Sequence, residues 1–235
     1  MTFAPFFGNA ALPNQVKAAL TLVLTVLLLP VYAAGNVAAA HSIGARTAEA
    51  LSEAVIGLMA GITTQFVFDG VELAGQILGF QFGFSLVNII DPNTKVQTTV
   101  LGSFHELFAL LVFMELGIQR WLLRAIAESF RLIPIGGFVG SKFLASQLLH
   151  MAGAMWLIGA EIAFPVVLAT MVVDLTVGFV SKASPQFPAM FFGISAKVLL
   201  GLAVLYGAVA FWPDSLAHYF YHALADLERL LSIAR

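Results

Sequence analysis

The amino-acid sequence predicts an all-α protein of the integral-membrane type, made of helical hairpins with long, bent apolar helices. Apolar residues make up 60% of the 235 residues and charged residues only 10%, against about 25% charged residues in soluble domains. The apolar residues form long runs separated by short polar segments. A surface with so few charges needs lipid or closely packed apolar partners to cover it. The composition therefore excludes a soluble globular domain.

Charge and residue types exclude several classes of function. The 11 Lys and Arg are scattered and the net charge is −2, so the chain lacks the basic patch of a nucleic-acid-binding protein. The absence of cysteine excludes disulfides, thiolate catalysis and cysteine-based metal sites. No nucleophile elbow and no phosphate-binding glycine loop occurs. An intramembrane hydrolase or metalloenzyme is therefore the least favoured class, and no cofactor is expected.

The N-terminal half contains three apolar runs. Residues 18–34 are just long enough to cross a membrane, and the 16 residues before Lys17 favour a retained span over a cleaved signal peptide. A polar loop at 35–53 leads into the second run. Residues 54–90 would measure about 55 Å as one helix, against about 30 Å of hydrocarbon, so we expect a bend or a hairpin. The third run, 101–117, carries three ionisable side chains that should face protein or water.

The C-terminal half begins with an amphipathic segment at 119–145. Its first part, QRWLLRAIAESFRL, spaces charges four residues apart, which predicts a helix at a polar boundary on the cytoplasmic side. Residues 146–180 are again too long for one simple span and contain a proline, so a kinked or hairpinned pair is expected. The last apolar run is 189–212. An amphipathic tail follows at 213–235.

Charged residues inside the apolar runs are expected to be buried and paired. An isolated carboxylate in hydrocarbon costs several kcal/mol, which favours pairing between helices or with partner subunits. The same side chains could instead form an ion or proton pathway, which leaves a small-molecule or ion transporter as an alternative function. The residues are Asp69, Glu72, Glu161, Asp174 and Lys197.

The tail spaces Asp214, His218, His222 and Asp226 four residues apart, so one helix face can carry all four. A zinc site has two histidines arranged in this way, but it usually takes further ligands from a second element. We therefore favour a polar stripe on a terminal helix and expect no metal site.

The stretch AGQILGFQFGFSLVNIIDP, residues 74–92, resembles the signature of the FliR/SctT family of flagellar and injectisome export-apparatus proteins. Further blocks follow the family's order: APFFGNAALPNQVKAAL near the start, LLRAIAESFRLIPIG, EIAFPVVLATMVVDLTVGFVSKASPQF and GISAKVLLGL. The resemblance covers nearly the whole chain and depends on the spaced set of blocks. The chain departs from the family pattern at 117–120, Pro188 and Ser195, so no role is carried over to those positions.

The resemblance implies a single FliR-like membrane domain over 1–235 and a non-enzymatic subunit of the type III protein export gate. FliR-like proteins assemble with FliP and FliQ into a helical hetero-oligomeric ring, FlhB associates with it, and unfolded substrates pass through. The implied location is the bacterial inner membrane at the flagellar basal body. The family's loop from the GFS motif to the DP motif closes the pore at rest, which carries over to residues 82–98.

The residues of this loop suit a plug. Pro92 blocks helix continuation after the turn former Asp91, so the segment must leave the helix. Its apolar side chains could fill a lumen and exclude water, and its small residues allow bending. The predicted plug residues are Phe82, Gly83, Phe84, Ser85, Leu86, Val87, Asn88, Ile89, Ile90, Asp91 and Pro92.

Overall fold

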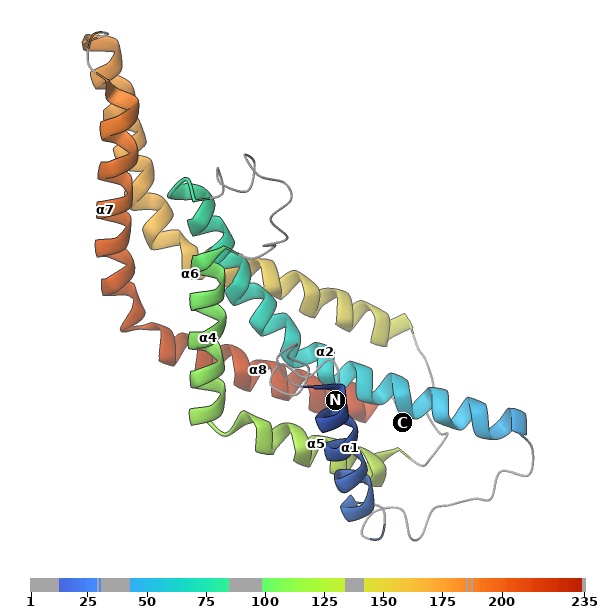
Figure 1. The fold of residues 1–235 in the computed structure, drawn as a ribbon. Helices are drawn as coiled ribbons and strands as arrows, with labels where there is room; N and C mark the ends of the chain where they lie inside the picture. The colour runs from blue at the N-terminus through green and yellow to red at the C-terminus, as the bar shows by residue number, and fades with distance from the viewer. Residues whose placement is uncertain are drawn as a thin grey trace. The chain divides into compact units, whose positions relative to one another are not determined.

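The computed structural model describes residues 13–28, 30, 43–84, 99–133, 142–184, 186 and 188–233. These residues form helices and no strand, which confirms the predicted all-α class (Figure 1). The helices are α1 (Asn14–Leu28), α2 (Ile43–Gln81), α4 (Val100–Glu115), α5 (Ile118–Leu132), α6 (Lys142–Ala183), α7 (Ala189–Val209) and α8 (Trp212–Ile233).

Three helices of the described chain are long and apolar enough to cross a membrane. They are α2, the segment Ala145–Ala183 of α6, and the segment Phe191–Val209 of α7. The consecutive helices α4 and α5 pass the same test only when they are counted as one broken span. These lengths confirm the predicted integral-membrane type. Helix α1 has 15 residues, fewer than the roughly 20 that a simple span needs.

The second apolar run contains no hairpin within the described residues. Helix α2 is continuous over 39 residues, so the hairpin, one of the two forms expected for 54–90, is wrong for residues 54–81. Gly70, Gly75 and Gly79 serve close packing of α2 against its neighbours. A Cβ on Gly75 would lie 2.5 Å from the Cα of Gly102 in α4. Because no proline interrupts the segment, close packing keeps it helical despite the weak helix propensity of glycine.

The run at 146–180 is also one helix. Helix α6 continues for 42 residues with Pro165 inside it, so a hairpin is wrong here too. Proline removes one backbone hydrogen bond and usually bends a helix. The neighbouring Ile162, Ala163 and Val166 are buried. Their packing holds the turns on both sides of the proline in helical form.

The chain divides into two compact units. The first consists of Met1–Phe68, Phe113–Gly153 and His218–Arg235, and the second of Asp69–Val112 and Ala154–Ala217. In the first unit, Phe68, Phe113 and Phe220 pack with their ring centroids 5.4 to 5.5 Å apart. A second part of its core combines apolar residues of α2, α5, α6 and α8: Ile56, Met59, Ala60, Leu122, Ala125, Met151, Leu227, Leu230 and Leu231.

Helix α5 and the residues of α8 from His218 onward belong to the first unit, in the parts of the chain where amphipathic segments are predicted at 119–145 and 213–235. Leu122 and Leu227 are buried on their inner faces, whereas Arg124 pairs with Glu128 on the exposed face of α5 at 3.4 Å. Gly117 precedes α5 with a φ of 67°, a left-handed conformation that favours glycine. This residue ends the turn after α4 and allows α5 to begin one residue later.

In the second unit, α7 runs antiparallel beside the C-terminal part of α6 (Figure 1). The contacts follow a regular register. Lys197 pairs with Asp174, and a Cβ on Gly193 would contact Val177 at 3.1 Å. Positions four residues apart share a helix face, so this register continues toward Gly201 of α7 and Thr170 of α6. This register therefore sets which residues of α6 and α7 lie side by side in the hairpin.

Candidate functional site

All described site residues predicted from the sequence belong to the second unit. Asp69, Glu72 and Phe82 lie in or directly after the last turns of α2, and Glu161, Asp174 and Lys197 lie on α6 and α7. Gly83 and Phe84 follow in the turn that ends α2. The predicted plug residues Ser85, Leu86, Val87, Asn88, Ile89, Ile90, Asp91 and Pro92 lie outside the described residues, as does the rest of the loop to residue 98.

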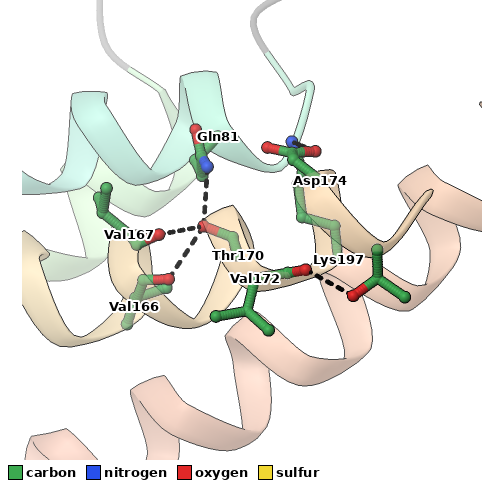
Figure 2. A network of polar contacts seen from close by, with 8 residues as sticks. Gln81, Val166, Val167, Thr170, Val172, Asp174 and Lys197 are labelled. Carbon is green, nitrogen blue, oxygen red and sulfur yellow. Dashed lines mark hydrogen bonds and ion pairs between the residues drawn. The ribbon is translucent and has the colours of Figure 1, made fainter. Parts of the chain in front are cut away.

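The structure brings Asp174 and Lys197 together across the hairpin. The Nζ atom of Lys197 lies 2.7 Å from Oδ1 of Asp174, as Figure 2 shows. The chain covers all but 19% of the lysine side chain and about half of the aspartate. Because an uncompensated charge between apolar helices is costly, this pair neutralises both groups where the two helices meet.

The other acidic residues are held locally. Glu72 accepts a hydrogen bond from Nε2 of Gln76, one turn later in α2, at 3.1 Å. Asp69 and Glu161 each interact with another group of the chain. The charge of Glu106 on α4 interacts with those of Asp69 and Glu72, a proximity that sequence analysis missed. The spacing within α2 places Asp69 and Glu72 on one face, but no local pattern connects them to α4.

No group of three or more histidines and acids in the described part of the chain is arranged to hold a metal ion. On α8 the rings of His218 and His222 lie 4.3 Å apart between centroids. This contact is what the spacing of four residues predicts for neighbouring side chains on one face. It brings in no ligand from a second element.

The end of α2 is closed by a glycine cap. Gly83 has a φ of 80°, its N–H donates to the Phe80 carbonyl, and the N–H of Phe84 donates to the Gly79 carbonyl at 2.9 Å. This pair of hydrogen bonds is a Schellman motif with glycine at the left-handed position. A glycine after the last turn of an apolar helix is a sequence signal for this cap. The sequence-based prediction places Gly83 in the plug as a small residue that allows bending, and does not identify it as a helix cap.

Phe82 is buried beside this cap. Its side chain is 2% exposed, and its ring fills the space over Gly201 of α7. A Cβ on Gly201 would overlap the ring, with Cζ only 2.6 Å away, and would approach Cγ2 of Thr170 at 3.2 Å. We call this contact the Phe82 seat. By contrast, Phe84 is 43% exposed, with its ring 5.9 Å from that of Phe82.

A hydrogen-bond network lies next to the Phe82 seat. Nε2 of Gln81 donates to Oγ1 of Thr170 at 2.8 Å, and that hydroxyl donates to the carbonyls of Val166 and Val167, each at 2.9 Å. Figure 2 shows these contacts joining the last turn of α2 to α6. Thr170 is fully buried. Its hydroxyl therefore supplies a polar partner that the amide of Gln81 needs at the helix end.

The start of α4 is attached to the same part of α2. Oγ1 of Thr99 donates to the Gly75 carbonyl at 3.2 Å and accepts from the N–H of Gly102 at 3.0 Å. A Cβ on Gly79 would lie 2.9 Å from the Thr99 side chain. The described residues on both sides of the 82–98 loop are thus fixed on the last turns of α2.

Long apolar helices, with an ion pair between two of them, define this chain as a helical membrane protein. A family model described as bacterial export proteins, family 1, matches residues 1–223. The chain belongs to this family.

Relatives of the chain carry the name flagellar biosynthetic protein FliR. The protein from Escherichia coli strain K12 is 27% identical over 230 residues, which cover 95% of this chain and 86% of the relative. The protein from Pectobacterium carotovorum is 26% identical over 234 residues, covering 97% and 88%. The protein from Bacillus subtilis strain 168 is 32% identical over 160 residues, covering 66% and 61%. These matches confirm the resemblance drawn from the sequence blocks.

Proposed function

We propose that this chain is a non-enzymatic subunit of the flagellar protein export gate in the bacterial inner membrane, at the basal body. The observation that carries the proposal is the family match over residues 1–223, together with relatives named as flagellar biosynthetic proteins. Unfolded export substrates pass through the channel that the chain helps to form. Its proposed partners are FliP-like, FliQ-like and FlhB-like subunits.

The uncovered surface of the second unit supports an assembled subunit. Most residues in the membrane-length segments of α6 and α7 are not buried by the chain itself. Large apolar side chains such as Leu175, Phe179 and Leu199 are exposed there. Apolar areas of this extent need lipid or partner subunits to cover them. We propose that sister subunits cover part of this surface and lipid the remainder.

The plug is the finer part of the proposal. We propose that residues from Phe84 to 98 close the channel at rest, with an apolar segment that excludes water and ions. Attachment of both loop ends to α2 supports this proposal, because a tethered segment returns to the same place after a substrate has passed. A seal of this kind must be displaced without unfolding the subunit, so contacts worth only a few kcal/mol should hold it.

Loop replacement tests the function. Exchanging residues 85–93 for a short Gly-Ser linker leaves the Gly83 cap and Thr99 in place. The complex should still assemble with its FliP-like and FliQ-like partners, as judged by co-purification, and membranes that contain it should leak small ions. An equally long exchange of residues 43–51 at the start of α2, where all positions except Glu49 are exposed, is the control and should not leak. An intact barrier in the assembled loop variant would refute the plug.

The alternative of an ion or small-molecule transporter is not favoured. The matched family is one of export proteins, and Asp174 and Lys197 neutralise each other. A pathway for ions along these residues would need a group that can change partners. The loop variant separates the two functions further, because a transporter should lose solute uptake whereas a gate should lose its barrier.

A further inference from the structure

The two described phenylalanines of the predicted plug differ in burial. Phe82 is 2% exposed and lies over Gly201, whereas Phe84, two residues later, is 43% exposed. The left-handed Gly83 between them turns the chain. A side chain that already fills a space between α2 and α7 is not available to fill a channel. Phe82 therefore has a different task from the residues that follow it.

The Phe82 seat depends on the absence of a side chain at position 201. Ring atoms of Phe82 occupy the volume in which a Cβ of residue 201 would stand. Interiors are packed too densely to accept even one added carbon without a shift of the neighbours. Any larger residue at 201 must therefore push the ring, and with it the end of α2, away from α7.

The ion pair and the seat lie one helical turn apart on the same two helices. Asp174 is four residues after Thr170 on α6, and Lys197 is four residues before Gly201 on α7. Such positions share a helix face. The contact between Lys197 and Asp174, drawn in Figure 2, thus fixes the spacing of α6 and α7. The Phe82 seat lies one helical turn away from this contact.

We propose that Phe82 and Gly201 form a joint through which the α6–α7 hairpin positions the start of the 82–98 loop, so that Phe82 is a positioning residue and not part of the seal. This inference rests on the proposed function, since it assigns the joint to the closed state of the gate. The hydrogen bond from Gln81 to Thr170 is a second contact in this joint, and it connects the end of α2 to α6.

A cross-linking experiment measures the joint directly. The natural chain has no cysteine, so Gln81→Cys with Thr170→Cys introduces the only thiols of this chain, and the cross-link is detected within this chain of the assembled complex. These substitutions remove the hydrogen bond and leave the Phe82 seat to hold the two positions together. Reaction with a short bifunctional thiol reagent should be efficient. Adding Gly201→Ala should lower the yield severalfold, and further adding Phe82→Leu, which makes room for the new Cβ, should restore it.

Gly207→Ala is the matched control. Gly207 is also in α7, but nothing lies within 4 Å of its added Cβ, so the cross-linking yield should not change. If Gly201→Ala leaves the yield as high as Gly207→Ala does, the joint does not hold the end of α2 and the inference is overturned. Phe82→Leu keeps the test decisive, because rescue by a second substitution cannot arise from general misfolding.

Ion permeability then tests the role of the joint in the closed gate. With the natural Gln81 and Thr170, Gly201→Ala should leak ions above the level of the unaltered complex, and Gly207→Ala should not. If the loop replacement leaks but Gly201→Ala does not, the inference fails and the proposed plug stands. If the loop replacement does not leak, the proposed plug fails, and the role of the joint in closing the gate fails with it.

Discussion

Lys197 of α7 and Asp174 of α6 form a 2.7 Å ion pair in a hairpin whose surface is otherwise largely apolar. The lysine is mostly covered by the chain and the aspartate about half covered. Each charge is therefore the main compensation for the other. The pair also fixes the register in which α6 and α7 meet.

Neutralising one member of this pair should destabilise the complex more than neutralising both. Asp174→Asn or Lys197→Met leaves an uncompensated charge and should cost about 1–3 kcal/mol, discounted because half of Asp174 is uncovered. The double substitution removes both charges and should recover most of the loss. Thermal unfolding of the purified complex measures each variant. A double variant that is less stable than either single one would contradict this interpretation.

Thr170→Val should weaken the attachment of α2 to α6. The substitution keeps the shape of the side chain but leaves the Gln81 amide without its 2.8 Å acceptor, which should cost about 1–3 kcal/mol. Thr176→Val on the same helix is the control, because the hydroxyl of Thr176 is exposed and bonds only the Val172 carbonyl. Unfolding temperatures of the two variants give the comparison. Equal effects would show that Gln81 does not depend on Thr170.

Gly75→Ala should separate α2 from α4. The added Cβ would lie 2.5 Å from the Cα of Gly102 and 2.7 Å from the Leu101 carbonyl oxygen, and backbone atoms cannot move aside cheaply. We expect a loss of about 2 kcal/mol or more. Gly57→Ala, in the same helix with no atom within 4 Å, should instead stabilise by up to about 1 kcal/mol through helix propensity. Chemical denaturation should give a lower free energy of unfolding for Gly75→Ala than for Gly57→Ala.

His105→Phe should be tolerated far better than His105→Ala. The ring of His105 is fully buried, lies 4.6 Å from that of Trp212 and is bonded through Nδ1 to the Leu101 carbonyl at 2.7 Å. Within the described residues Nε2 has no hydrogen-bond partner. Phenylalanine keeps the ring contacts without this polar atom, whereas alanine leaves a cavity that costs about 2–4 kcal/mol. The unfolding temperature should be highest for the natural chain or His105→Phe and lowest for His105→Ala. Equal losses of stability for the two substitutions would mean that Nε2 does have a partner.

Composition and segment lengths predict the fold class and several helices because these features depend on local sequence. The pattern around Trp121 and Arg124 predicts α5, and the proline-rich segment before α7 marks its start. A hairpin is one of two forms expected for each long run, and it is wrong for the described residues 54–81 and for 146–180. The arithmetic assumed that each run crosses a membrane at its minimal length. Gly75 is as compatible with close helix packing as with a break, and only its contact with α4 distinguishes the two.

The site could be predicted only in part, because its contacts join helices that are far apart in the sequence. The costs of burying charge predict that Asp174 and Lys197 need partners, and the structure pairs them with each other. No local pattern identifies which acid the lysine meets. Phe82 belongs to the loop by its position in the sequence, yet its surroundings are set by Gly201, more than a hundred residues later. Such contacts depend on the register in which helices that are distant in the sequence pack against each other.

The glycine cap at Gly83 has an evolutionary consequence. The carbonyls of Leu78, Gly79 and Phe80 accept hydrogen bonds from Phe82, Phe84 and Gly83, so these bonds at the end of α2 do not involve the residues that come after Phe84. Those residues can gain, lose or exchange side chains without unwinding α2. The segment between α2 and α4 can thus vary in sequence while the helices that support it stay unchanged.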